Sequence, residues 1–205
     1  MTIATTPDLA LRPVHLRGSR VTRALMRLAG WQVDFDGLPS KQGVVIVYPH
    51  TSNWDFVVGI GAKWVIGWPL AFWGKDTLFD VPLFGRWLRW IGGVPVSRSN
   101  PQGAVTQMVE RLRSARERGE FLWLALSPEG TRRYREHWRS GFYQVALQAG
   151  VPLALAYFDY RQKRVGVDSF LQLSGDPSRD MAEIERRLGH RQGHKRQQAA
   201  PIRLP

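Results

Sequence analysis

One segment, Val44-Val45-Ile46-Val47-Tyr48-Pro49-His50-Thr51-Ser52-Asn53-Trp54-Asp55, joins a strand to a helix. Its first five residues are apolar and mostly β-branched, which predicts a short buried strand. The proline ends that strand, and the three polar residues after the histidine are suitable N-caps for a helix that begins near Trp54. His50 therefore lies at a strand-to-helix junction, the place where open α/β sheets bind their ligands.

The remainder of the chain alternates between strand and helix patterns. Further strands are expected at 70–73, 94–96, 121–126 and 153–158, and helices at 16–30, 54–66, 101–118, 142–149 and 179–188. Segment 75–89 reads as helix or turn. This alternation predicts an α/β sandwich. We divide the 205 residues into a basic amphipathic segment (1–30), one central domain (31–188) and a basic tail (189–205) that we expect to be disordered.

Composition excludes several kinds of site. The chain has no cysteine, which excludes disulfides, a thiol nucleophile and thiolate metal ligands. No His-x-x-x-His pair falls inside a predicted element, so we expect no metal site. The net charge of +12 attracts polyanions, which include nucleic acid, anionic lipid headgroups and phosphorylated substrates.

The N-terminal helix is basic and amphipathic. Val21, Ala24, Leu25 and Leu28 share one side, and arginines occupy the neighbouring side. This pattern suits a membrane surface, although a helix packed on the domain with solvated arginines would show the same one. The apolar run 56–73 contains Lys63, Pro69 and three glycines, so we predict no transmembrane helix. Six of the nine tryptophans fall within residues 54–90. Tryptophans in this cluster could be core residues or could lie at a membrane interface.

His50 and Asp55 form the first candidate catalytic pair. An imidazole can accept a proton from an attacking hydroxyl, and a carboxylate beside it can hold the ring tautomer and stabilise the imidazolium. A single histidine before a helix is more often a capping or packing residue. The catalytic interpretation therefore depends on a second signal farther along the chain.

That second signal is Glu129-Gly130-Thr131-Arg132, which follows the predicted strand at 121–126. Gly130 would let a phosphate approach the backbone, Thr131 offers a hydroxyl, and Arg132 can make a bidentate contact with phosphate. Glu129 could hold Arg132 or another arginine in place. Arg98 is a further candidate for the same anion. The alternative for residues 129–132 is a tight turn with a surface salt bridge. The alternative for Arg98 is an ordinary exposed arginine.

In order and spacing, four blocks resemble the glycerolipid acyltransferase family, whose best-known members are the lysophosphatidate acyltransferases. That family carries His-x-x-x-x-Asp, Gly-x-x-Phe-Ile-x-Arg, Glu-Gly-Thr-Arg and Val-Pro-x-x-Pro. This chain has His50 to Asp55, Gly92 to Arg98, Glu129 to Arg132 and Val151 to Leu155. The first and third blocks are intact. Pro95-Val96 replace Phe-Ile in the second block, and Leu155 replaces the last proline of the fourth. In the family these two blocks help shape the acceptor side.

The resemblance implies a mixed sheet flanked by helices, and transfer of a fatty acyl group from acyl-CoA or acyl-carrier protein to a lysolipid hydroxyl in phospholipid biosynthesis. The acceptor would be 1-acyl-glycerol-3-phosphate or a similar lysolipid. His50 would be the base and Asp55 its partner, and the acceptor phosphate would contact Arg98, Glu129, Gly130, Thr131 and Arg132. No metal or bound cofactor is implied. The enzyme would sit at the cytoplasmic face of a membrane, as a peripheral or monotopic protein.

Three alternatives stay open at this point. The same chemistry could serve another acceptor, such as an amino-acid-derived lysolipid or some other alcohol. The chain could be a membrane-bound remnant that binds an acyl donor without turnover. A basic nucleic-acid-binding protein is a third class, but no helix-turn-helix, zinc-finger or RNA-binding signature is present, so we expect no nucleic-acid partner.

Overall fold

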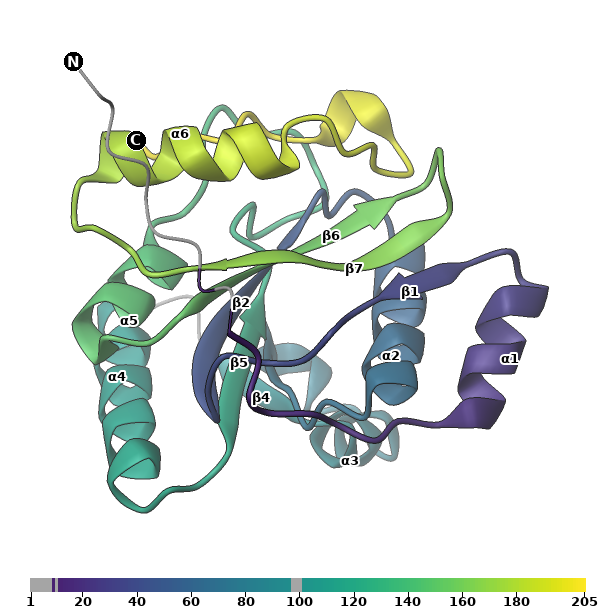
Figure 1. The fold of residues 1–205 in the computed structure, drawn as a ribbon, viewed down its shortest axis with the longest axis horizontal. Coiled ribbons are helices and arrows are strands. Elements are labelled where there is room, and N and C mark those ends of the chain that lie inside the picture. Colours follow the sequence, from purple (N-terminus) through teal and green to yellow (C-terminus); the bar gives the residue numbers. More distant parts are fainter. Residues whose placement is uncertain (1–8, 10, 97–100) are drawn as a thin grey trace.

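A seven-stranded mixed sheet forms the centre of the protein, in the order β1-β7-β6-β2-β5-β3-β4 (Figure 1). The structure is a computed structural model and describes residues 9, 11–96 and 101–205. All strand pairs are parallel except β6 with β7, which are antiparallel. Helices flank both faces of the sheet, which confirms the predicted α/β class.

The strands are β1 (Gln32–Asp34), β2 (Gln42–Tyr48), β3 (Ala71–Lys75), β4 (Gly93–Val96), β5 (Leu122–Leu126), β6 (Leu153–Asp159) and β7 (Arg164–Leu171). The helices are α1 (Arg20–Leu28), α2 (Trp54–Ile66), α3 (Phe84–Trp90), α4 (Pro101–Glu117), α5 (Gly141–Ala149) and α6 (Pro177–Leu188), with short 3₁₀ turns η1 (Asp76–Leu78) and η2 (Arg196–Gln198). The sequence predicted α2 at its observed bounds. It did not predict β1 or β7.

β2 lies in the middle of the sheet, where it pairs with β5 on one side and β6 on the other. A parallel strand buried on both faces needs a continuous apolar run, which is what residues 44–48 supply. β2 and β5 run in the same direction, so the loops that follow them meet at one edge of the sheet. These two loops carry His50 and Glu129.

The core has a layer on each face of the sheet. Val44 and Ile46 of β2 pack with residues of α4, α5 and α6, and Val45 packs on the other face with Trp68 and Trp123. Gly43 is opposite Trp123 in the register, and a Cβ at this glycine would lie 2.2 Å from the Trp123 ring. The absence of a side chain there lets the indole lie across β2.

The tryptophan cluster divides between buried and exposed positions. Trp68 is buried in the core, whereas Trp54, Trp64, Trp87 and Trp90 are exposed, the last at 75%. Within the described part of the chain, no helix is both long enough and apolar enough to span a bilayer.

The expectation that the C-terminal tail is disordered is wrong. We call residues 189–204 the C-terminal segment; it packs along the site edge of the sheet and contains the buried residues Ala200 and Ile202. Its order comes from these few apolar contacts and from backbone hydrogen bonds to the rest of the fold, neither of which a polar, basic composition reveals.

Candidate active site

His50 and Asp55 lie next to each other, as their spacing predicted. His50 follows β2, Asp55 is in the first turn of α2, and His50 Nδ1 lies 3.2 Å from Asp55 Oδ2. The Asp55 side chain is fully buried, while that of His50 is 24% exposed. An imidazole whose Nδ1 faces a buried carboxylate presents Nε2 as its proton acceptor.

The Asp55 carboxylate is held by three further donors. Oδ2 accepts from the backbone N–H groups of Thr51 (2.7 Å) and Ser52 (2.8 Å), and Oδ1 accepts from the Tyr160 hydroxyl (2.7 Å). Burial alone would raise the pKa of Asp55, but the hydrogen bonds from His50, Tyr160 and Ser52 outweigh burial and lower it. Asp55 is therefore an anion at neutral pH that can stabilise an imidazolium on His50.

Glu129 braces the loop that carries His50. It is buried, its Oε2 accepts from the His50 backbone N–H at 2.6 Å, and its Oε1 accepts from the Ala200 N–H at 2.9 Å. Burial, and then the charge of Asp55, raise the pKa of Glu129 to about 7, although the two backbone hydrogen bonds act in the opposite direction. Among the described residues its carboxylate thus meets backbone amides rather than the arginine that we expected it to hold.

The next three residues form a turn at the edge of the site. Gly130 has φ of +64°, and a Cβ there would lie 2.7 Å from Nε of Arg139. Thr131 Oγ1 accepts from the Arg133 backbone N–H at 3.3 Å, and Arg132 is exposed. The turn that follows Glu129 therefore carries two exposed arginines, Arg132 and Arg133, whose guanidinium groups are of the kind that binds anions. Arg98, the remaining predicted site residue, lies outside the described residues.

The C-terminal segment completes the site, which sequence reasoning missed. The Lys195 N–H donates to Thr51 Oγ1 at 3.1 Å, and the Tyr48 hydroxyl donates to the Ala200 carbonyl at 3.1 Å. Gly193 lies so close to Thr51 that a Cβ would come within 2.7 Å of its Oγ1. The apolar run 199–202 inside an otherwise polar tail was the signal that could have indicated this packing.

A cavity of about 410 Å³ lies between strands β3 and β4 and helix α4. Its lining includes Trp73, Val94 and Met108, with Arg111 as a charged residue. No group of three or more His, Asp or Glu side chains that could hold a metal occurs in the described ranges.

Comparison with known proteins identifies relatives of this fold and site. Residues 32–156 match the sequence model of a family described as Acyltransferase. The chain is 26% identical over 151 residues to the 1-acyl-sn-glycerol-3-phosphate acyltransferase of Cocos nucifera, a match that covers 72% of this chain and 47% of that protein. It is 32% identical over 88 residues to lysophosphatidylcholine acyltransferase 2 of Danio rerio, which covers 43% of this chain and 16% of the other. The matches thus span less than half the length of either relative.

A solved structure has the same fold. The crystal structure of the 1-acyl-sn-glycerophosphate (LPA) acyltransferase PlsC from Thermotoga maritima aligns with a TM-score of 0.53 at 18% identity. The alignment covers 80% of this chain and 72% of that one. At this level of identity the likeness concerns the arrangement of the sheet and helices.

Proposed function

Because the chain belongs to the acyltransferase family, as its four sequence blocks indicated, we propose that it moves a fatty acyl group from an acyl thioester to the hydroxyl of a lysolipid. The donor is acyl-CoA or acyl-carrier protein, and the acceptor is 1-acyl-glycerol-3-phosphate or a similar lysolipid of phospholipid biosynthesis. The observation that carries this proposal is the partly exposed His50 beside the buried Asp55 carboxylate, which has four polar partners.

His50 acts as the general base. The acceptor oxygen attacks the thioester carbonyl carbon as His50 Nε2 takes the hydroxyl proton, and Asp55 stabilises the imidazolium that forms. The tetrahedral intermediate then collapses: the carbon–sulfur bond breaks, the ester remains, and the thiolate takes the proton back from His50. General base catalysis of this kind contributes about 10²–10⁴-fold. The chain's own residues suffice for these steps, so neither a metal nor a bound organic cofactor is required.

The acceptor phosphate binds at the turn after β5. Arg132 supplies a guanidinium, Thr131 a hydroxyl, and Gly130 a backbone that a phosphate oxygen can approach, with Arg98 as a further cation. Glu129 contributes indirectly, because its carboxylate anchors the His50 loop and the C-terminal segment. The altered second and fourth sequence blocks leave a different lysolipid acceptor as the alternative within the same chemistry.

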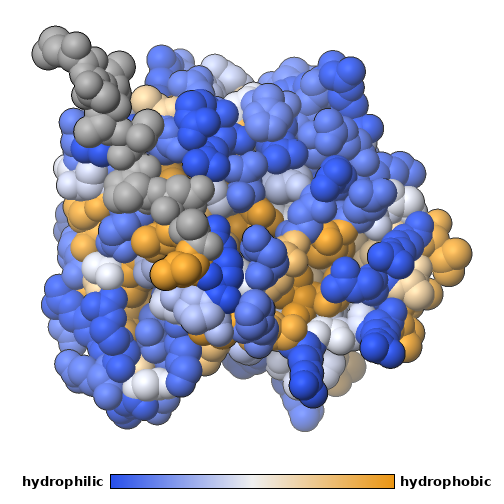
Figure 2. Space-filling model, in the orientation of Figure 1, coloured by the Kyte–Doolittle hydropathy of each residue, from blue (hydrophilic) through white to orange (hydrophobic). Residues whose placement is uncertain are grey.

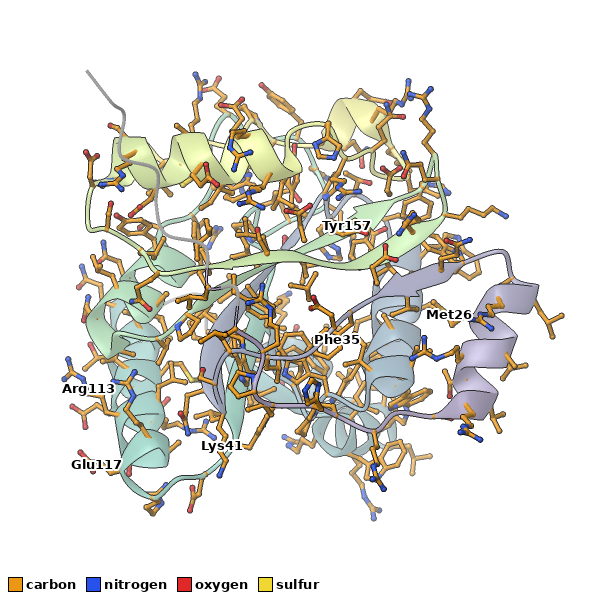
Figure 3. The ribbon with its side chains drawn as sticks, viewed as in Figure 1. Met26, Phe35, Lys41, Arg113, Glu117 and Tyr157 are labelled. Carbon is orange, nitrogen blue, oxygen red and sulfur yellow. The ribbon has the colours of Figure 1, made fainter. Side chains whose placement is uncertain are left out.

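The protein docks on the cytoplasmic face of a membrane through α1, as a peripheral or monotopic protein. Val21, Leu25 and Leu28 are 71%, 61% and 85% exposed, so the apolar side of α1 faces outward. Hydrophobic residues gather at the right edge of the molecule in Figure 2, where α1 lies in Figure 1. The side of α1 that faces α2 carries Met26, which lies against Gly61 (Figure 3). This orientation supports membrane docking over a helix packed by its apolar side.

The decisive experiment measures thiol release from long-chain acyl-CoA by the purified protein, with and without lysophosphatidate. Wild type, His50→Ala and the control His15→Ala are compared. We expect release that needs the acceptor and His50 but not His15. Retained turnover in His50→Ala would overturn the mechanism. If acyl-CoA gives no release, acyl-carrier-protein donors and a panel of lysolipids follow, and inactivity with all of them would overturn the function.

A further inference from the structure

Tyr160 contacts the Asp55 carboxylate although it lies 105 residues later in the chain. It directly follows β6, and its hydroxyl donates to Asp55 Oδ1 at 2.7 Å. The other oxygen, Oδ2, faces the two backbone amides and His50. Among the described residues, Tyr160 is the partner that holds Oδ1.

The second oxygen matters because of how a carboxylate rotates. The terminal torsion of an aspartate is broad and roughly two-fold, so contacts on one oxygen alone leave the plane of the group loosely defined. A donor on Oδ1 fixes that plane, and with it the direction in which Oδ2 faces His50. The Asp55 side chain is fully buried, so bulk water has no access with which to replace the phenol.

Tyr160 is itself rigidly placed. Its ring makes edge-to-face contacts with Trp31 (4.9 Å between centroids) and His194 (5.1 Å), and its backbone N–H donates to the Gln192 carbonyl at 2.8 Å. Burial, followed by the hydrogen bond to Asp55, raises the pKa of Tyr160, so the phenol stays protonated and acts as the donor. The C-terminal segment therefore supports the same carboxylate through this ring.

We propose that Tyr160 is a positioning residue for the His50–Asp55 pair: its hydroxyl fixes the rotation of the Asp55 carboxylate and so orients the imidazole. This inference rests on the proposed function, because it assigns a catalytic consequence to that pair. Tyr160 acts through Asp55 and does not contact substrate. A substitution of Tyr160 should therefore slow the chemical step and leave substrate binding unchanged.

The chain offers a matched control. Tyr157, three residues earlier on β6, also donates its hydroxyl to a carboxylate, that of Asp34, which is paired with Arg164 rather than with His50 (Figure 3). Tyr160→Phe and Tyr157→Phe therefore delete the same kind of hydrogen bond and keep the same ring. We expect Tyr160→Phe to lower kcat about 10-fold at unchanged KM for both substrates, and Tyr157→Phe to change neither.

A second measurement separates this inference from the proposed function. In protein labelled with ¹⁵N-histidine, the Nδ1–H resonance of His50, assigned by its loss in His50→Ala, should move in Tyr160→Phe and stay in place in Tyr157→Phe. This readout needs no substrate. If His50→Ala abolishes turnover but Tyr160→Phe changes neither kcat nor the resonance, the inference is wrong and the function stands. If His50→Ala retains turnover, the proposed mechanism fails.

A loss of folding stability in either Tyr→Phe variant can be distinguished from a loss of positioning. Thermal unfolding of both variants shows whether each is folded at the assay temperature. If Tyr160→Phe is unfolded there, 3,5-difluorotyrosine at position 160 keeps the ring and the hydroxyl but makes the phenol a stronger acid. It should then move the His50 resonance, and an unmoved resonance would overturn the inference.

Discussion

Replacing Val21, Leu25 and Leu28 of α1 with serine should detach the protein from membranes without unfolding it. α1 contains no buried residue, and these three side chains are its most exposed apolar groups on one side. Surface substitutions of this kind usually change the free energy of unfolding by less than about 0.5 kcal/mol each. The triple variant should therefore keep a melting temperature close to that of the wild type.

The loss of membrane affinity can be worked from the same three residues. Full burial of a Val or Leu side chain contributes about 1.5–3 kcal/mol. A helix lying in the interface buries its apolar side only part of the way, so we take about 1 kcal/mol for each residue. The sum of about 3 kcal/mol corresponds to a partition coefficient roughly 100-fold lower.

The assay is co-sedimentation with vesicles of phosphatidylcholine containing an anionic lipid. Arg113→Ser with Glu117→Ser on α4, which lies on the opposite side of the molecule from α1, is a control that leaves the net charge unchanged (Figure 3). Substituting Arg20, Arg23 and Arg27 should weaken binding to anionic vesicles alone, and high salt should erase that difference. A folded Val21/Leu25/Leu28 variant that binds as well as the wild type would refute docking through α1.

Three further predictions concern the site. Asp55→Asn should lower kcat at least about 100-fold and reduce the free energy of unfolding by about 1–3 kcal/mol, because its amide would face backbone donors; steady-state kinetics and urea unfolding check this. Arg132→Ala should raise KM for a phosphorylated acceptor about 10-fold with little change in stability or in KM for the donor, and an unchanged KM would reject the phosphate contact. Burial raises the pKa of Glu129 to about 7, so between about pH 4.5 and 7 this carboxyl group is protonated in the folded state but ionised in the unfolded state. The protonated Glu129 therefore contributes its full stabilisation below pH 4.5, and that contribution is lost as the pH rises through 7. Urea unfolding across this range should show that slope in the wild type and not in Glu129→Gln.

Local signals predicted most of the fold. β2 and α2 were predicted because an apolar β-branched run, a proline and helix-capping residues follow one another within a few positions. The strand β7 was missed because Gly166, Asp168 and Ser169 interrupt its apolar pattern. Asp168 is stabilised by an ion pair with Arg191 of the C-terminal segment, a partner that the sequence around β7 does not reveal.

The contacts of the candidate site also divide into local ones, which the sequence predicted, and long-range ones, which it did not. The His50–Asp55 contact lies within one loop and the first turn of one helix, so the spacing alone predicted it. The contacts of Tyr160 with Asp55 and of Ala200 with Glu129 join residues far apart in the chain. Such contacts depend on the strand order and on the path of the C-terminal segment, which a single sequence does not specify.

The central position of β2 has a consequence for how the protein folds. Its two neighbours come from much later in the chain, since Val44 pairs with Leu124 on one side and Leu153 on the other. Long-range pairing of this kind slows folding. During synthesis, residues 44–48 leave the ribosome with both strand edges unpaired, and they form a short, uncharged, β-prone run of the kind that aggregates. We therefore expect the yield of native protein to depend on temperature and on chaperones, through the same five residues that place His50.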